Sequence, residues 1–164
     1  MSTITAIIPT FNEAIHVNDV IASLKWCDRI IVIDSFSADE TASLATAAGA
    51  EVVQRAYQGP AEQKNHAITL AKSDWVIILD ADERVTPELQ SEIEAIIQQD
   101  HPAHQAYWIG RRNHFLGKEV KYSGWQSDKV IRLFKRGQCV YGKQMVHEEM
   151  ECSCSVGKLN HKLL

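Results

Sequence analysis

Three carboxylates follow directly after an apolar run near the middle of the sequence. Residues 76–79 are Val-Ile-Ile-Leu, and Asp80, Asp82 and Glu83 come next. Like charges this close repel, so water or a bound cation must offset them. In an extended chain, Asp80 and Asp82 point to the same side and offer the hard oxygen ligands that Mg²⁺ or Mn²⁺ takes. Capping of a following helix would explain Asp82 or Glu83 but not Asp80. The spacing therefore predicts a metal site completed by phosphate oxygens.

Polar side chains also follow two earlier apolar runs. The run at 4–8 is followed by Thr10, Asn12 and Glu13. The run at 29–34 ends on a carboxylate and continues with hydroxyls and a second carboxylate: Asp34, Ser35, Ser37 and Asp39. In an open parallel sheet, ligands bind beyond the carboxyl ends of the strands. These side chains are therefore predicted to converge with the 80–83 cluster at one edge of a sheet.

The elements that must position these groups alternate along the first hundred residues. Runs rich in Val and Ile predict buried strands at 4–8, 29–34, 51–54 and 75–80. Helical spacing of apolar residues predicts helices at 17–24, 39–48, 61–71 and from Thr86 onward, with Thr86 as N-cap and Pro87 in the first turn. Such alternation indicates an α/β fold with a mostly parallel sheet and helices on both faces.

The rhythm of the sequence changes after about residue 105. The stretches 106–115 and 128–134 are typical of strands, and turns are predicted at Gly110, Gly117 and Gly137. The chain is thus interpreted as one domain over 1–164, with a nucleotide-binding half at 1–100 and a strand-rich half at 101–164. The apolar end of the sequence has no helix stop, so we expect the chain to be truncated at its C-terminus.

Composition restricts the class of protein. With 164 residues, the chain is long enough for one domain with a core. Because no run approaches the roughly 20 apolar residues of a spanning helix and no basic leader is seen, a cytoplasmic location is expected. The net charge of −4 argues against nucleic acid. Residues 1–100 hold 6 Lys and Arg against 16 Asp and Glu, whereas 101–164 hold 11 against 5. The basic half is either solvated surface or a site for an anionic partner.

The four cysteines are scattered, at positions 27, 139, 152 and 154. Free thiols in a reducing compartment are the expected state. A zinc site remains as an alternative, and its ligands would be His147, Cys152, Cys154 and His161.

Phosphate chemistry can be narrowed by the motifs that are missing. The sequence has no Gly-x4-Gly-Lys-Ser/Thr and no Gly-x-Gly-x-x-Gly, which excludes a P-loop and argues against a dinucleotide fold. A phosphatase with an aspartyl nucleophile also has Asp-x-Asp after a strand. It expects a small residue at the position of Arg84, however, and usually carries the motif on its first strand.

Four stretches in order resemble one known family: IIPTFNEA, VIDSFSADET, YQGPAEQKNHAI and VIILDADERVTPEL. Together they are similar to the landmarks of glycosyltransferase family 2, whose members are inverting enzymes with the GT-A fold. The likeness covers roughly residues 4–90. Two later stretches, GWQSDKVIRLFKR and MVHEEM, resemble the subgroup of bacterial lipopolysaccharide or lipooligosaccharide core β-glucosyltransferases.

The resemblance implies a role for each matched residue. The nucleotide-sugar pocket would be lined by Pro9, Thr10, Asn12, Glu13, Asp34, Ser35, Lys64 and Asp80. Asp34 would bind the uracil or ribose, and Lys64, where relatives commonly have Arg, would lie near base or phosphate. A Mg²⁺ or Mn²⁺ ion would be held by Asp82, with Asp80 and His147 as further contacts.

The acceptor side follows from the chemistry of inversion, which needs a base opposite the leaving diphosphate. Asp128 matches the acidic position of the family and is the predicted base. Its alternative is a surface Asp paired with Lys129 or Arg132. Trp125 would stack on a sugar or fill the core. The basic half would attract a phosphorylated acceptor through Arg111, Arg112, Lys118, Lys121 and Arg132.

The resemblance implies transfer of a sugar, glucose by the subgroup, from a UDP-sugar to an anionic saccharide or lipid-linked saccharide, with peripheral contact to the cytoplasmic face of the inner membrane. Phe36 departs from the family, which often has Gly at that position, and places a bulky ring near the nucleotide. Two other functions stay open, a nucleotidyltransferase and a non-catalytic nucleotide-sugar-binding module. A nucleotidyltransferase would carry a Gly-rich basic loop after the first strand, which this sequence lacks.

Overall fold

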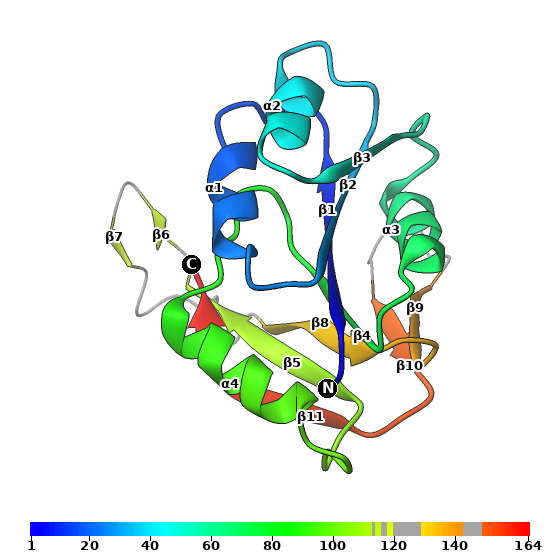
Figure 1. The fold of residues 1–164 in the computed structure, drawn as a ribbon, viewed down its shortest axis with the longest axis vertical. Coiled ribbons are helices and arrows are strands. Elements are labelled where there is room, and N and C mark those ends of the chain that lie inside the picture. The colour runs from blue at the N-terminus through cyan, green and yellow to red at the C-terminus, as the bar shows by residue number, and fades with distance from the viewer. Residues whose placement is uncertain (113, 116–117, 120–128, 143–148) are drawn as a thin grey trace.

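A seven-stranded sheet runs through the molecule, and both halves of the chain contribute strands to it (Figure 1). The computed structural model describes residues 1–112, 114–115, 118–119, 129–142 and 149–164. The first half gives β1 (Ile4–Thr10), β2 (Arg29–Asp34), β3 (Glu51–Gln54) and β4 (Trp75–Ile78). The second half gives β5 (Ala106–Arg111), β8 (Lys129–Lys135) and β11 (Val156–Leu163).

The strand order is β11-β5-β8-β4-β1-β2-β3. The pairs among β1 to β4 are parallel, and so is β11 with β5. Strand β8 alone runs against its two neighbours, β4 and β5. The sheet is therefore mostly parallel, as predicted. The carboxyl ends of β1, β2 and β4 lie next to one another at one edge, since β1 is flanked by the other two.

Helices cover both faces of this sheet (Figure 1). One core cluster joins the sheet to α1 (Val17–Ser23), α2 (Thr41–Ala47) and α4 (Pro87–Ile97). The other face packs against α3 (Pro60–Leu70) and the small ribbon of β9 (Cys139–Tyr141) and β10 (Met150–Cys152). A second ribbon, β6 (His114–Phe115) with β7 (Lys118–Glu119), stands apart from the sheet. Within the described residues, no helix is both long and apolar enough to span a bilayer.

The predicted boundaries hold well in the first half. Strands 29–34 and 51–54 are confirmed to the residue. Helix α4 begins as expected, because the Thr86 side chain accepts a hydrogen bond from the backbone N–H of Leu89 at 3.2 Å. The strand predicted to end at residue 80 ends earlier, at Ile78, and the backbone N–H of Glu83 donates to the carbonyl of Asp80 at 3.0 Å. The chain therefore turns after Asp80, so the extended geometry assumed for Asp80 and Asp82 is wrong.

In the second half, the predicted strands are confirmed in outline as β5, β6 and β8, but β7, β9, β10 and β11 were not predicted. Gly110 is not a turn residue, because it lies inside β5 opposite Lys129. Gly137 does lie in a turn, with φ of 84°. The turn predicted at Gly117 lies outside the described residues.

A bulge in β8 bears directly on the site. Tyr107 of β5 pairs with Leu133, but the next residue, Trp108, pairs with Ile131. Arg132 is therefore an extra residue with no partner on β5. Bulges re-aim side chains and often lie beside functional sites. Here the bulge sits next to the end of β4, which leads into Asp80.

Candidate nucleotide site

Asp34 is buried at the carboxyl end of β2, with no exposed surface. Its Oδ1 accepts hydrogen bonds from the hydroxyls of Thr10 at 2.8 Å and Ser37 at 2.6 Å, and its Oδ2 accepts one from the Ser37 backbone N–H at 2.9 Å. Gln54 is a more distant donor at 3.4 Å. Burial alone would raise the pKa of Asp34, but the bonds from Ser37, Thr10 and Gln54 outweigh it and hold the pKa below its ordinary value. Asp34 is therefore a fixed, ionised acceptor.

The loop after β1 is tied to the loop after β2. The backbone N–H of Asn12 donates to the Ser37 hydroxyl at 2.9 Å, and the Asn12 side chain accepts from the N–H of Ala38 at 2.8 Å. Glu13 donates its backbone N–H to the Thr41 hydroxyl at 2.8 Å. Asn12 holds a left-handed backbone with φ of 55°, which Asn tolerates better than most residues. The residues predicted to line one pocket thus form one connected rim, with Pro9 and Thr10 at the end of β1 behind it.

Helix α3 connects this rim to the acidic cluster. Gln63 is buried, and its amide donates to the Ser35 hydroxyl at 3.0 Å while its carbonyl accepts from Arg55 at 2.9 Å. The next residue, Lys64, is 8% exposed and places its Nζ 3.7 Å from Oδ1 of Asp80. Two consecutive residues of one helix therefore contact the ends of β2 and β4.

Asp80 lies in a network of charges. Nη2 of Arg132, the bulged residue of β8, contacts Oδ2 of Asp80 at 2.5 Å and Oε1 of Glu83 at 2.9 Å. The other oxygen of Glu83 accepts from the backbone N–H of Asp80 at 2.9 Å. Arg111 adds a third cation, with Nη1 3.6 Å from Oε1 of Glu83. Glu83 thus closes the turn after β4 and is buried there, rather than capping α4.

The pKa values of Asp80 and Glu83 are shifted in opposite directions. Burial opposes the charge on Asp80, but Arg132 and Lys64 outweigh it and hold the pKa of Asp80 below its ordinary value. Burial raises the pKa of Glu83, and the neighbouring charge of Asp80 adds to this effect, while Arg132 offsets only part of it. Asp80 is therefore the more acidic of the two groups.

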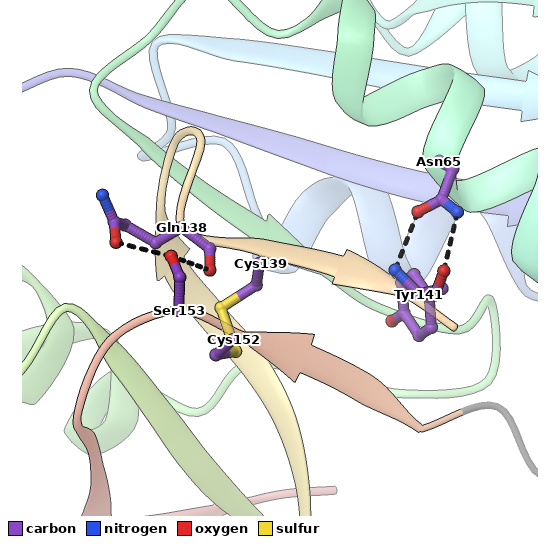
Figure 2. The surroundings of a disulfide bond; sticks show 6 residues. All are labelled: Asn65, Gln138, Cys139, Tyr141, Cys152 and Ser153. Atoms are coloured by element: carbon purple, nitrogen blue, oxygen red, sulfur yellow. Dashed lines mark hydrogen bonds between the residues drawn. A yellow bond between two sulfur atoms is a disulfide. The ribbon is translucent and has the colours of Figure 1, made fainter. Parts of the chain in front are cut away.

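Tyr141, at the end of β9, forms the far side of this cluster. Its backbone is held to α3 by two bonds with the Asn65 side chain, N–H to Oδ1 at 2.8 Å and Nδ2–H to carbonyl at 2.9 Å (Figure 2). Lys64 lies over the Tyr141 ring, 5.1 Å from its centre. A cation over an aromatic face is attracted by the ring. Lys64 is thus held between a ring and a carboxylate.

The predicted metal ligands are only partly described. Asp82 is exposed, two residues after Asp80. His147 and the predicted base Asp128 lie outside the described residues, as does Trp125. Among the residues that are described, no group of three His, Cys, Asp or Glu is arranged to hold a metal. Mg²⁺ is often bound by one or two carboxylates together with phosphate oxygens of the substrate.

One predicted role is wrong. Arg132 was expected to attract an anionic acceptor from the surface, but it is 3% exposed and is already paired with Asp80 and Glu83. Of the other expected cations, Arg111 is partly exposed and also faces Glu83. The side chains of Lys118 and Lys121 lie outside the described residues.

The expectation of free cysteines is wrong for two of the four. Strands β9 and β10 place Cys139 directly opposite Cys152, with Cα atoms 4.1 Å apart, and the two form a disulfide (Figure 2). Cys27 and Cys154 are free. The zinc alternative fails as well, because Cys152 is in the disulfide and His161 places its Nδ1 2.8 Å from Glu92. The cause of the error is that neither β9 nor β10 was predicted, so the two cysteines were not expected to meet.

Several residues of the site escaped sequence analysis. Gln63 and Tyr141 were given no role. Ser37 and Glu83 were predicted to lie at the sheet edge, but their bonds to Asp34 and Arg132 were not predicted. A signal existed for Gln63, which precedes Lys64 in a matched stretch. The bulge that turns Arg132 toward Asp80 has no signature in the sequence.

Relatives were found by sequence comparison. An uncharacterized glycosyltransferase of Rickettsia bellii is 43% identical over 108 residues, which cover 65% of this chain and 37% of that protein. The lipopolysaccharide core biosynthesis glycosyltransferase LpsC of Rhizobium meliloti is 28% identical over 160 residues, covering 94% of this chain and 59% of LpsC. The chain thus spans between a third and three fifths of the length of these relatives.

Solved structures share the fold. Residues 1–349 of TarS from S. aureus superpose with a TM-score of 0.72 at 15% identity, over 98% of this chain and 59% of that one. Glucosyl-3-phosphoglycerate synthase from Mycobacterium tuberculosis, solved with Mn²⁺, UDP and glucosyl-3-phosphoglycerate, gives 0.54 at 24% identity, over 65% of this chain and 43% of that one. Both are glycosyltransferases of the GT-A fold.

The family is shown by a family model that matches most of the chain. The family model described as Glycosyl transferase family 2 matches residues 5–153, which include all the site residues described above. The carboxylates that follow β2 and β4, buried Asp34 and partly exposed Asp80, are joined through α3. Their arrangement agrees with the order of motifs by which the sequence resembled this family. The chain belongs to glycosyl transferase family 2.

Proposed function

We propose that this chain binds a UDP-sugar together with Mg²⁺ or Mn²⁺ and transfers the sugar, with inversion, to a saccharide acceptor. The observation that carries the proposal is the bridge made by α3. Gln63 bonds to Ser35 beside the hydrogen-bond acceptor Asp34, and Lys64 pairs with Asp80 in the charged cluster. A nucleoside diphosphate has complementary groups at its two ends. Its nucleoside carries neutral N–H and O–H donors that an acceptor such as Asp34 can bind, and its diphosphate carries negative oxygens that a cation such as Lys64 can bind.

Asp34 is suited to the nucleoside end. A fixed carboxylate accepts hydrogen bonds, and uracil N–H and ribose hydroxyls are donors. An adenine ring presents a different edge, with a ring nitrogen that accepts. Asp34 is therefore the proposed source of a preference for UDP over ADP.

The charged cluster is suited to the diphosphate end. Lys64 and the ion at Asp82 would neutralise negative charge on the leaving diphosphate, which is the chemistry that a divalent ion supplies in such a site. Asp80 fits a contact to ribose and ion, since it stays ionised beside Arg132 and Lys64. The synthase from Mycobacterium tuberculosis that shares this fold was solved with Mn²⁺ and UDP, which supports the same pairing here.

The acceptor is proposed from the relatives. LpsC is named for lipopolysaccharide core biosynthesis, which favours a core-type saccharide acceptor, and glucose as the sugar comes from the subgroup resemblance. Asp128 is the proposed base. Replacing it by Asn keeps the size but removes proton acceptance, so transfer should fall by about 10²–10⁴-fold while donor affinity stays unchanged. A cytoplasmic location and a contact with the inner membrane stay predictions.

The proposal is tested by calorimetric titration of UDP with and without Mn²⁺. Wild type should bind UDP more tightly with the metal, and Asp82→Ala should lose that gain. Asp100→Ala, a change at another exposed aspartate, is the matched control and should keep the gain. Equal UDP binding by wild type and Asp82→Ala under both conditions would contradict the metal site, and no binding of UDP at all would contradict the function.

A further inference from the structure

Phe36 has a backbone conformation that its side chain does not favour. Its φ is 59°, in the left-handed region where a bulky residue is strained. Among the described residues other than glycine, only Asn12 shares this property. Such strain persists only where the surroundings impose it, and it gathers at functional sites.

The surroundings that impose it are the two neighbours of Phe36. Ser35 donates its backbone N–H to the carbonyl of Thr10 at 3.0 Å and accepts from Gln63. Ser37 gives both its N–H and its hydroxyl to Asp34. Phe36 is thus held between two residues that are fixed on either side, one of them by the carboxylate of the nucleoside site.

The Phe36 ring makes little packing contact with the rest of the protein. Phe36 is 57% exposed, so packing against the protein does not explain why a phenyl ring stands there. Phe11, at the end of β1, is 59% exposed. Thr10 and Asn12, on either side of Phe11, bond to Ser35 and Ser37, on either side of Phe36. The two exposed rings therefore belong to adjacent, cross-linked loops, and both loops bond to Asp34 through Thr10 and Ser37.

We infer that Phe36 is a nucleotide-binding residue that covers one face of the nucleobase bound at Asp34. This inference rests on the proposed function and extends it. Every nucleobase has a flat face that an aromatic ring can stack on, and Asp34 supplies the edge contact that a stack alone lacks. The strain at Phe36 is then tolerated because a ring at this position binds ligand.

The test uses opposite effects on binding and on stability. Phe36→Gly and Phe36→Asn relax the backbone and remove the ring, because Gly and Asn tolerate a positive φ. UDP affinity should fall by about 10-fold, the order of one lost base–aromatic stack. The melting temperature should stay equal or rise. Phe36→Tyr keeps the ring and should keep the affinity.

The metal provides a second control. A base contact acts whether or not the ion is bound, so the loss in the Phe36 variants should be the same with Mn²⁺ and with a chelator. The loss in Asp82→Ala should appear only with Mn²⁺.

Three results would overturn the inference while leaving the proposed function intact. They are unchanged UDP affinity in Phe36→Gly, a loss seen only with Mn²⁺, and a loss accompanied by a lower melting temperature. Failure of wild type to bind UDP would instead overturn both.

Discussion

Asp34 and Asp80 lie at the ends of two strands that flank β1, yet their charges are stabilised in different ways. Asp34 is surrounded by hydroxyls, an amide and a backbone N–H, all of them neutral. Asp80 shares its surroundings with Glu83 and with the cations Lys64 and Arg132. Both have a lowered pKa, but for different physical reasons.

The difference teaches what each end can receive. Neutral donors leave the full negative charge of Asp34 in place, so this end favours ligand groups that donate hydrogen bonds. At the other end, the cations Lys64, Arg111 and Arg132 lie against the carboxylates Asp80 and Glu83. That end can accept negative oxygens. The polarity of the site is thus built into the two strand ends.

The largest effect is expected from a change in the charged cluster of Asp80, Glu83 and Arg132. Arg132→Met keeps a long side chain but leaves buried Glu83 and partly exposed Asp80 without their shared cation. Removing one partner of a buried ion pair costs about 3–5 kcal/mol of stability, which urea unfolding would measure. Adding Glu83→Gln to this variant should recover part of the loss.

The matched control is Glu51→Gln, which breaks the Arg29–Glu51 pair at the surface, where Glu51 is half exposed. Its cost should be at most about 1 kcal/mol. If Arg132→Met and Glu51→Gln lowered the free energy of unfolding equally, the burial of Arg132 would add nothing to the stability of its ion pairs.

A smaller effect is expected at the neutral end. Asp34→Asn preserves shape but turns one acceptor into a donor that faces Thr10 and Ser37, which should cost about 1–3 kcal/mol. The same change should reduce the preference for UDP over ADP, measured by competition between the two nucleotides. If ADP competes as well as UDP in wild type, Asp34 does not read the base.

The stability contributions of Asp34 and Glu83 are expected to depend on pH in opposite directions. The pKa of Asp34 is below its ordinary 3.8, so its stabilising contribution is present above about pH 4 and is lost as pH falls through the lower, folded value. The pKa of Glu83 is raised above 4.5, so its contribution is present below that value and is lost as pH rises through the folded pKa.

The measurement is the melting temperature between pH 3 and 7. Asp34→Asn should flatten the acid limb, below about pH 4. Glu83→Gln should change the profile only above about pH 4.5. If both variants altered the melting temperature over the same pH range and with the same sign, the opposite pKa shifts assigned to Asp34 and Glu83 would be wrong.

The smallest effect is a salt dependence. Raising ionic strength from about 0.05 to 0.5 M should weaken UDP binding by about two- to fivefold, because mobile ions screen the partly exposed charges at the Asp80 end. Lys64→Met should reduce this slope, and Asp34→Asn should leave it unchanged. Equal slopes in all three proteins would place the diphosphate away from Lys64.

The first half of the fold was readable from the sequence because its signals are local. Apolar runs give β2 and β3 to the residue, and Thr86 with Pro87 gives the start of α4. The convergence of Asp34 and Asp80 follows from parallel strands alone. These features need no knowledge of distant contacts.

The remaining features depend on contacts between distant residues. Arg132 meets Asp80 because of a one-residue bulge in β8, and Cys139 meets Cys152 because two three-residue strands pair. Short strands carry almost no periodic signal. The turn after β4 likewise depends on Glu83, whose buried carboxylate needs Arg132 from 49 residues further along the chain.

The position of β8 between β4 and β5 has a consequence for how the protein is made. Strand β4 ends at residue 78, but its neighbour in the sheet begins only at residue 129. A ribosome that adds about 5–20 residues per second needs several seconds to make the chain in between. During that time β4 has a bare edge that can pair with other chains. The nascent protein is therefore expected to depend on chaperone protection during synthesis more than its finished fold suggests.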